Sequence, residues 1–196
     1  MPPTIQVWSD FVCPFCMIAE APLQQALREW DRPVAVRWMP FELRPAPTPT
    51  LRPEDGYLQS IWPQSVYPLA EQFGVDIRLP SVSPQPHTHL AWQGFQFAEA
   101  QGRGNEYNHA VLAAFFQHDR DIGSVDVLAD IARDLGLDRD LFSTALRERR
   151  YREAHQRAFD EALDAGVTSV PTFRIGERWL RGVQPAERLL AALEAA

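Results

Sequence analysis

The chain has 196 residues, of which 45% are hydrophobic and 23% are charged, as in a globular protein with one core or one domain inserted into another. A net charge of −7 and the absence of any basic run argue against nucleic-acid binding, because neutralising phosphates requires clustered Lys or Arg. All 19 cationic residues are Arg, which excludes an enzyme with a lysine nucleophile or Schiff base.

The N-terminal segment predicts a β-α-β unit. Residues 4–8, TIQVW, alternate apolar and polar side chains and are rich in β-branched and aromatic residues, which is typical of a strand. From Pro14 to Trp30 the apolar residues recur with a helical period, and Pro14 suits a first helical turn because its missing N–H is not needed there. Residues 34–41, VAVRWMPF, predict a second strand.

The middle of the chain predicts an extended connector followed by helices. Residues 42–56 are so rich in proline that neither a helix nor a central strand is expected. A short helix is predicted within residues 65–75, SVYPLAEQFGV. Residues 87–165 are almost wholly helical in pattern, with Ser124 as the N-cap of one helix, and their apolar stripes indicate core faces.

The C-terminal segment returns to strands. Residues 170–176, VPTFRIG, and 178–182, RWLRG, predict a β-hairpin, and residues 184–196 predict a closing helix. The whole order is β-α-β, a helical block, then β-β-α. We therefore expect an α/β thioredoxin fold with a large all-helical insertion: residues 1–60 and 166–196 form the thioredoxin-like domain, and residues 61–165 form the inserted helical domain.

The chain has two cysteines, Cys13 and Cys16, at the start of the first predicted helix. The sequence opens without a basic segment followed by an apolar one and has no apolar run of about 18 residues, so we expect a cytoplasmic protein without a membrane partner. A structural disulfide is unfavourable in that compartment. A CxxC pair also supplies too few ligands for zinc, and none of the histidines has a zinc-finger spacing, so no metal is predicted.

A redox pair is therefore the preferred interpretation. With CxxC after the first strand, Cys13 is expected at a helix N-terminus, where unpaired N–H groups favour an exposed thiolate. Cys16, one turn further along, is expected to be shielded. Asp10 is either a turn residue or a proton acceptor for the buried thiol.

The segments DFVCPFC, GVTSVPTFRIG and the helical block between them resemble the DsbA-like thioredoxin superfamily. Residues 121–138 and 182–193 resemble its cytoplasmic FrnE-type branch in particular. The resemblance implies that Cys13 is the nucleophile and Cys16 the resolving cysteine. It also implies that Pro171 is a cis-proline, and that Val170 before it offers backbone groups to an extended substrate.

The resemblance further implies that Pro14 and Phe15, between the cysteines, tune the redox potential and face the substrate. Strongly oxidising exported members carry His where this chain has Phe15. Since Phe offers neither charge nor hydrogen bond to the sulfur, we expect a less oxidising pair and slightly favour reduction in the cytoplasm. Alternatively, Phe15 only covers apolar surface.

Two rival functions stay open. The 2-hydroxychromene-2-carboxylate isomerases and kappa-class glutathione transferases share the implied fold, bind glutathione and typically carry Ser where Cys13 stands. Retention of both cysteines favours thiol–disulfide exchange with a protein or small-molecule substrate, with no cofactor beyond the redox-active pair and with glutathione or another small thiol as an alternative co-substrate. No sequence feature favours the other rival, a metal-holding or chaperone-like protein. The sequence also does not indicate an oligomeric state.

Overall fold

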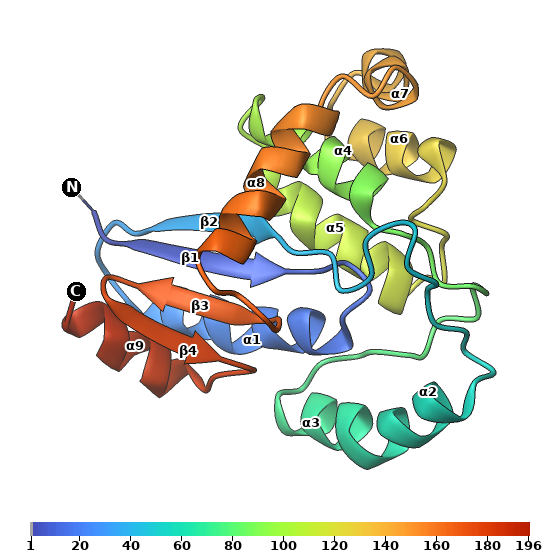
Figure 1. The fold of residues 1–196 in the computed structure, drawn as a ribbon. Coiled ribbons are helices and arrows are strands. Elements are labelled where there is room, and N and C mark those ends of the chain that lie inside the picture. The colour runs from blue at the N-terminus through green and yellow to red at the C-terminus, as the bar shows by residue number, and fades with distance from the viewer. Residues whose placement is uncertain (1) are drawn as a thin grey trace.

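The computed structural model describes residues 2–196, and a four-stranded sheet lies at its centre (Figure 1). The strand order is β2-β1-β3-β4, with β1 and β2 parallel and the other two pairings antiparallel. The strand bounds are β1 Thr4–Ser9, β2 Ala35–Pro40, β3 Thr172–Ile175 and β4 Arg178–Arg181. All four predicted strands are confirmed, and both chain ends contribute to one sheet, as the thioredoxin fold requires.

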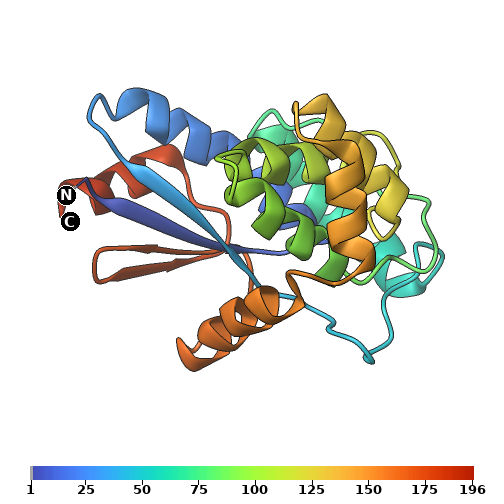
Figure 2. The same ribbon diagram turned by 90° about the horizontal axis from the view of Figure 1, so that it is seen from above.

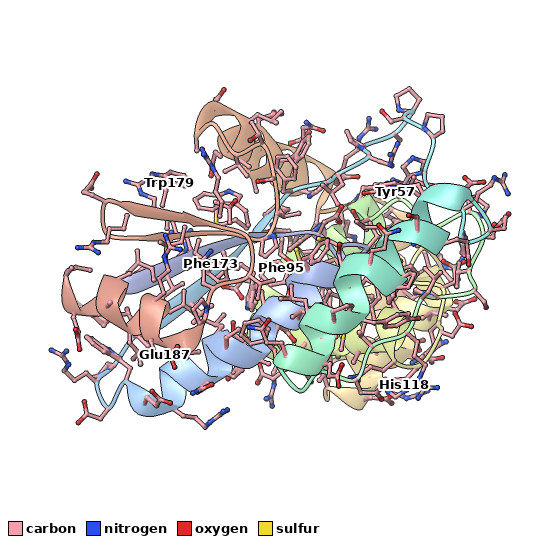
Figure 3. All side chains as sticks on the ribbon, turned by 90° about the horizontal axis from the view of Figure 1, so that it is seen from below. Tyr57, Phe95, His118, Phe173, Trp179 and Glu187 are labelled. Atoms are coloured by element: carbon pink, nitrogen blue, oxygen red, sulfur yellow. The ribbon has the colours of Figure 1, made fainter. Side chains whose placement is uncertain are left out.

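The central strand β1 has two faces with different neighbours. Ile5 and Val7 are fully buried in the main hydrophobic cluster together with Phe173 of β3, against α1 (Pro14–Glu29) and α9 (Ala186–Glu194). Figure 2 shows α1 and α9 on one side of the sheet and α8 (Arg152–Asp164) on the other. Figure 3 labels Phe173 of β3 and Trp179 of β4, whose ring stacks on Trp8 of β1 at 5.0 Å between centroids.

Helices α4 to α7 (residues 89–147) of the predicted helical block lie beyond one end of the sheet, whereas its last helix, α8, lies over a face of the sheet (Figures 1 and 2). The main hydrophobic cluster includes Trp92 and Phe115 as well as Ile5 and Leu23, so block and sheet share one core. The division of the chain at residues 61 and 165 stays a prediction. The remaining helices are α2 Gly56–Ile61, α3 Tyr67–Gln72, α4 His89–Glu99, α5 Gly104–Phe116, α6 Val125–Asp134 and α7 Arg139–Arg147, with a π-helical turn, Trp62–Val66, between α2 and α3.

The helix predicted within residues 65–75 begins earlier than expected, at Gly56. Pro63 and Pro68 lie within the first two positions of the π-helical turn and of α3. A proline there removes an N–H that has no partner in its own segment, so the chain can pass both prolines in helical conformation. The proline-rich residues 42–55 contain no helix or strand, as predicted.

The ends of several helices share a left-handed residue just after the C-cap. After α3, α6 and α8 this residue is Gly74, Gly136 and Gly166, with φ of 66°, 80° and 75°. Glycine suits this conformation because it has no Cβ. After α7 the equivalent residue is Arg149, with φ of 56°. None of the helices in residues 2–196 is long and apolar enough to cross a membrane.

Candidate active site

The two cysteines lie at the N-terminus of α1, directly after the end of β1. Cys13 is the N-cap residue of α1, and its backbone N–H donates to the carbonyl of Asp10 at 3.1 Å. The backbone N–H of Cys16 donates to the carbonyl of Cys13 at 3.0 Å. Both cysteines are free thiols, and the single helical turn between them places both sulfurs at the same helix end.

The loop before β3 meets this helix end. The thiol of Cys13 donates to the carbonyl oxygen of Val170, with 3.6 Å between sulfur and oxygen, although 157 residues separate the two. The Val170–Pro171 peptide bond is cis. The loop is held by a hydrogen bond from the Gly182 N–H to the Pro171 carbonyl at 2.8 Å and by one from the Thr172 hydroxyl to the Ser169 carbonyl at 2.7 Å.

The fold therefore brings Cys13, Cys16, Val170 and Pro171 together. Pro14 occupies the first turn of α1 and is half-buried. Phe15 is also half-buried and packs against both hydrophobic clusters, which agrees with the interpretation that it covers apolar surface.

The expectation that Cys13 is exposed was wrong. Cys13 is 3% exposed and Cys16 is 1% exposed. A second hydrophobic cluster surrounds both sulfurs, and it receives Phe41 from the end of β2 and Phe159 from α8, whose rings lie 5.7 Å apart. The complete cluster is Trp8, Cys13, Cys16, Met39, Phe41, Phe159, Ala162, Val167 and Val170. Very little of Cys13 is therefore open to solvent.

Burial has its largest electrostatic effect on Cys16. Removal from water raises the pKa of the Cys16 thiol well above its ordinary value, and the neighbouring Cys13 thiol raises it further. Hydrogen bonds from the Ser9 hydroxyl and from the backbone at Asp10 act in the opposite direction. Cys16 is therefore held as a neutral thiol in the dithiol form, as expected for the shielded partner.

Asp10 is a turn residue with a buried side chain, 1% exposed. Its carboxylate accepts the Leu43 N–H at 2.8 Å and ties the turn to the proline-rich connector. Desolvation raises the pKa of Asp10 to about 7, and the nearby Glu42 carboxylate adds to this, while hydrogen bonds from Thr88 and Leu43 oppose it. Within residues 2–196 its carboxylate has no hydrogen bond to Cys16, so the proton-acceptor interpretation gains no support.

The comparisons with known proteins agree with this geometry. The DSBA-like thioredoxin domain model matches residues 4–194. The chain belongs to the DSBA-like thioredoxin domain family. The uncharacterized protein YwbO of Bacillus subtilis (strain 168) is 46% identical to it over 180 residues, which are 91% of this chain and 89% of YwbO.

Solved structures share the DSBA-like fold at lower identity. A probable DsbA oxidoreductase from Streptomyces coelicolor has a TM-score of 0.82 and 22% identity, covering 98% of this chain and 89% of its own. A 2-hydroxychromene-2-carboxylate isomerase has a TM-score of 0.76 and 18% sequence identity, and the match covers 98% of this chain and 93% of the isomerase chain. A third structure is that of the cytosolic disulfide reductase DsbM from Pseudomonas aeruginosa with glutathione. It has a TM-score of 0.68 and 19% sequence identity, and the match covers 98% of this chain and 94% of the DsbM chain.

Sequence reasoning missed one feature of this DSBA-like site, a buried acid–histidine pair. Glu42 and His155 lie 2.6 Å apart between Oε1 and Nε2, with side chains 7% and 5% exposed. They stand 113 residues apart in the chain, so no local pattern could connect them. His87 and His89 lie at the start of α4, and His87 contacts the Thr48 carbonyl at 2.9 Å. No three His, Cys, Asp or Glu in residues 2–196 form a metal-binding group.

Proposed function

We propose that this DSBA-like protein is a thiol–disulfide oxidoreductase in which Cys13 attacks the substrate and Cys16 resolves the mixed disulfide. The observation that carries the proposal is the position of the Cys13 thiol at the N-cap of α1, 3.6 Å from the Val170 carbonyl of the loop before β3. A helix N-terminus stabilises a thiolate, and an extended loop beside it offers backbone groups to a substrate segment.

The first step is attack by the Cys13 thiolate on one sulfur of the substrate disulfide. The substrate S–S bond breaks, a disulfide between Cys13 and the substrate forms, and the first substrate thiolate leaves and takes up a proton. Val170 and Pro171 are the proposed contacts for the substrate chain, with Pro14 and Phe15 on the other side of the sulfur. Because Cys13 is 3% exposed, this step follows displacement of part of the aromatic cover.

The second step is attack by Cys16 on the sulfur of Cys13. Cys16 loses its proton, the Cys13–Cys16 disulfide forms, and the second substrate thiolate leaves and takes up a proton. Two electrons thus pass from the protein to the substrate. Two molecules of a small thiol such as glutathione would restore the dithiol and form their own disulfide. The raised pKa of Cys16 favours keeping it protonated until the mixed disulfide has formed.

Reduction is the direction we propose, in the cytoplasm and within the FrnE-type branch. Phe15 stands between the cysteines and provides no hydrogen bond or charge to stabilise a thiolate, which favours a less oxidising pair. The fold neighbour DsbM is described as a cytosolic disulfide reductase, and one of its structures contains glutathione. These likenesses support the choice of direction and of a small thiol as co-substrate.

A glutathione-dependent isomerase or kappa-type transferase is the second candidate, because a 2-hydroxychromene-2-carboxylate isomerase shares the fold. Such a reaction needs the residue at the position of Cys13 but not a resolving thiol. Cys16→Ser separates the two candidates. It should abolish multiple-turnover disulfide reduction and trap a mixed disulfide on Cys13, whereas a glutathione-dependent isomerisation should survive it.

The deciding experiment is the reduction potential of the Cys13–Cys16 pair, measured by equilibration in glutathione buffers followed by thiol alkylation. A value near that of thioredoxin, about −270 mV, is the expected result for a reductant. A value near about −120 mV would make the protein an oxidant and contradict the argument from Phe15. Failure of any intramolecular disulfide to form would overturn the dithiol mechanism.

A further inference from the structure

A cavity of about 630 Å³ lies between the proline-rich connector, α4 and α8. Its wall includes the buried pair Glu42 and His155, the side chain of Gln93 and two exposed arginines, Arg149 and Arg152. A volume of this size is in the range of small-molecule sites, about 300–1,000 Å³. None of the steps proposed above uses this cavity.

Arg149 occupies a backbone position that suits glycine. It has φ of 56° and directly follows the C-cap of α7. At the same position after α3, α6 and α8 the residue is a glycine with positive φ. A non-glycine residue in this conformation is unfavourable and calls for a reason in its side chain. Asp119, the other such residue in the described chain, has one: its carboxylate accepts hydrogen bonds from the N–H and hydroxyl of Ser81.

The guanidinium of Arg149 has no such partner. Within residues 2–196, neither Arg149 nor Arg152 forms an ion pair or a side-chain hydrogen bond, whereas the nearby Arg150 contacts Glu148 at 2.6 Å. The acidic residue of the wall, Glu42, is already engaged by His155 at 2.6 Å. The cavity therefore presents two free cationic groups, in a chain whose net charge is −7.

One side chain connects the cavity to the dithiol. Phe159 lines the cavity and also belongs to the cluster that covers Cys13 and Cys16. Its ring lies 6.4 Å from that of His155 on the cavity side. Phe159 is therefore the side chain common to the cavity wall and to the cluster that contains both cysteines.

We propose that this cavity binds the carboxylate of a small disulfide substrate through Arg149 and Arg152, so that the protein acts preferentially on acidic small-molecule disulfides. The inference rests on the function proposed above and names its substrate class. The exchange is the two-step reaction already described: the acidic disulfide is reduced to two thiols, and Cys13 and Cys16 are oxidised to a disulfide. The guanidinium groups make charge-assisted hydrogen bonds to a carboxylate, which hold the substrate beside Phe159.

The test uses three small disulfides that differ mainly in charge: 3,3′-dithiodipropionate, which is anionic, bis(2-hydroxyethyl) disulfide, which is neutral, and cystamine, which is cationic. The pre-reduced protein is mixed with each, and the rate of Cys13–Cys16 oxidation is followed by alkylation. Each rate is divided by that of dithiothreitol with the same disulfide, which removes intrinsic differences in reactivity between the disulfides. We expect the anionic disulfide to react about tenfold faster than the neutral one, and the cationic one slowest.

Arg149→Gly is the decisive variant, because glycine suits the backbone there and the fold should be kept. It should remove most of the preference for the anionic disulfide and leave the rate with the neutral one unchanged, and Arg152→Gln should act in the same direction. Arg150→Gln, which changes a neighbouring arginine outside the cavity wall, is the matched control and should leave all three rates unchanged. Added salt should reduce the preference of the unmodified protein.

The outcomes are separable. If none of the three disulfides oxidises the protein to an intramolecular disulfide, the proposed function itself falls. If the neutral and anionic disulfides react equally, or if Arg149→Gly keeps the preference, the reductase function stands and the arginine site is overturned. A preference for an acidic cystine-bridged peptide over all three small disulfides would also overturn the inference, because the cavity would then not select small molecules.

Discussion

Two acid–histidine pairs connect the sheet layer to the helical block, and they lie at different depths. Glu42 and His155, beside the dithiol, are both buried, and Glu42 Oε2 and His155 Nδ1 have no partner within residues 2–196. Glu20 and His109, between α1 and α5, lie 2.8 Å apart, but the His109 side chain is 70% exposed and Asn108 also donates to Glu20 at 2.8 Å. The same two residue types thus form one pair with both members buried, near the cysteine cluster, and a second pair in which only the acid is buried.

Removing the histidine of each pair should give the largest contrast. His155→Ala removes a buried ring and leaves Oε1 of the buried Glu42 without its hydrogen-bond partner, and we expect the free energy of unfolding to fall by about 3–5 kcal/mol. His109→Ala removes a side chain that is 70% exposed and leaves Glu20 with its hydrogen bond from Asn108, so a loss below about 1 kcal/mol is expected. Urea denaturation of both variants measures the difference, and equal losses would show that depth does not distinguish the pairs.

The buried carboxyl of Asp10 should make the stability of the protein depend on pH. Its pKa is raised from 3.8 to about 7, so between these values the folded protein binds more protons than the unfolded chain. The free energy of unfolding should therefore fall as pH rises from about 4 to about 7, by up to about 4 kcal/mol, and stay level above. Asp10→Asn should flatten this dependence in urea denaturation between pH 4 and pH 8.

The pKa of His109 is also raised, so His109 should change stability in the same direction as Asp10, at higher pH. The hydrogen bond to Glu20 raises the pKa of His109, so its stabilising contribution is present below the ordinary value of 6.5 and is lost as pH rises through the raised value. Because the side chain is mostly exposed, the effect should be small. A pH dependence that survives Asp10→Asn but disappears in His109→Gln would contradict the assignment of the larger effect to Asp10.

Accessibility of the thiols should depend on Phe159. Phe159→Leu removes a ring that belongs both to the cavity wall and to the cluster around the cysteines, while keeping an apolar side chain. We expect alkylation of Cys13 by iodoacetamide to accelerate about tenfold, which corresponds to opening of the cover becoming easier by about 1.4 kcal/mol. The matched control is Met17→Leu, next to the Glu20–His109 pair on α1, which should leave the rate unchanged. Equal rates in Phe159→Leu and the unmodified protein would show that another part of the cluster limits access.

The backbone conformation of Arg149 should also affect stability. Arg149→Gly relieves a left-handed conformation and should raise the free energy of unfolding by about 1 kcal/mol. Asp119→Gly relieves the same conformation but loses the hydrogen bonds to Ser81, so no gain is expected there. Thermal or urea denaturation compares the two, and a gain in Asp119→Gly alone would overturn the view that only Arg149 lacks a structural partner.

Local patterns predicted the elements of this fold well. Strand alternation identified β1, and Ser124 was correctly identified as an N-cap, since its hydroxyl accepts the Val127 N–H at 3.5 Å. The start of α2 was missed because prolines at residues 63 and 68 weaken the helical signal, although both fall in first turns, where proline is tolerated.

The site was predictable only in part, for a physical reason. The spacing of Cys13 and Cys16 is local, and the family resemblance added Val170 and Pro171 from the other end of the chain. The cover over Cys13 comes from Phe159 of α8, and the pairing of Glu42 with His155 spans 113 residues, so both depend on tertiary packing. Arg149 was missed because left-handed helix ends are recognised in a sequence by glycine.

The sheet built from both chain ends has a consequence for synthesis on the ribosome. β1 can pair with β2 early, but its other edge stays open until Thr172–Ile175 has been made, which takes on the order of ten seconds at ribosomal rates. During this interval Val170 and Phe159 are also missing, so the nascent chain carries Cys13 and Cys16 without their cover. Before synthesis is complete, the cysteines are thus open to oxidation and the free edge of β1 is open to pairing with other chains, whereas both are covered in the folded protein.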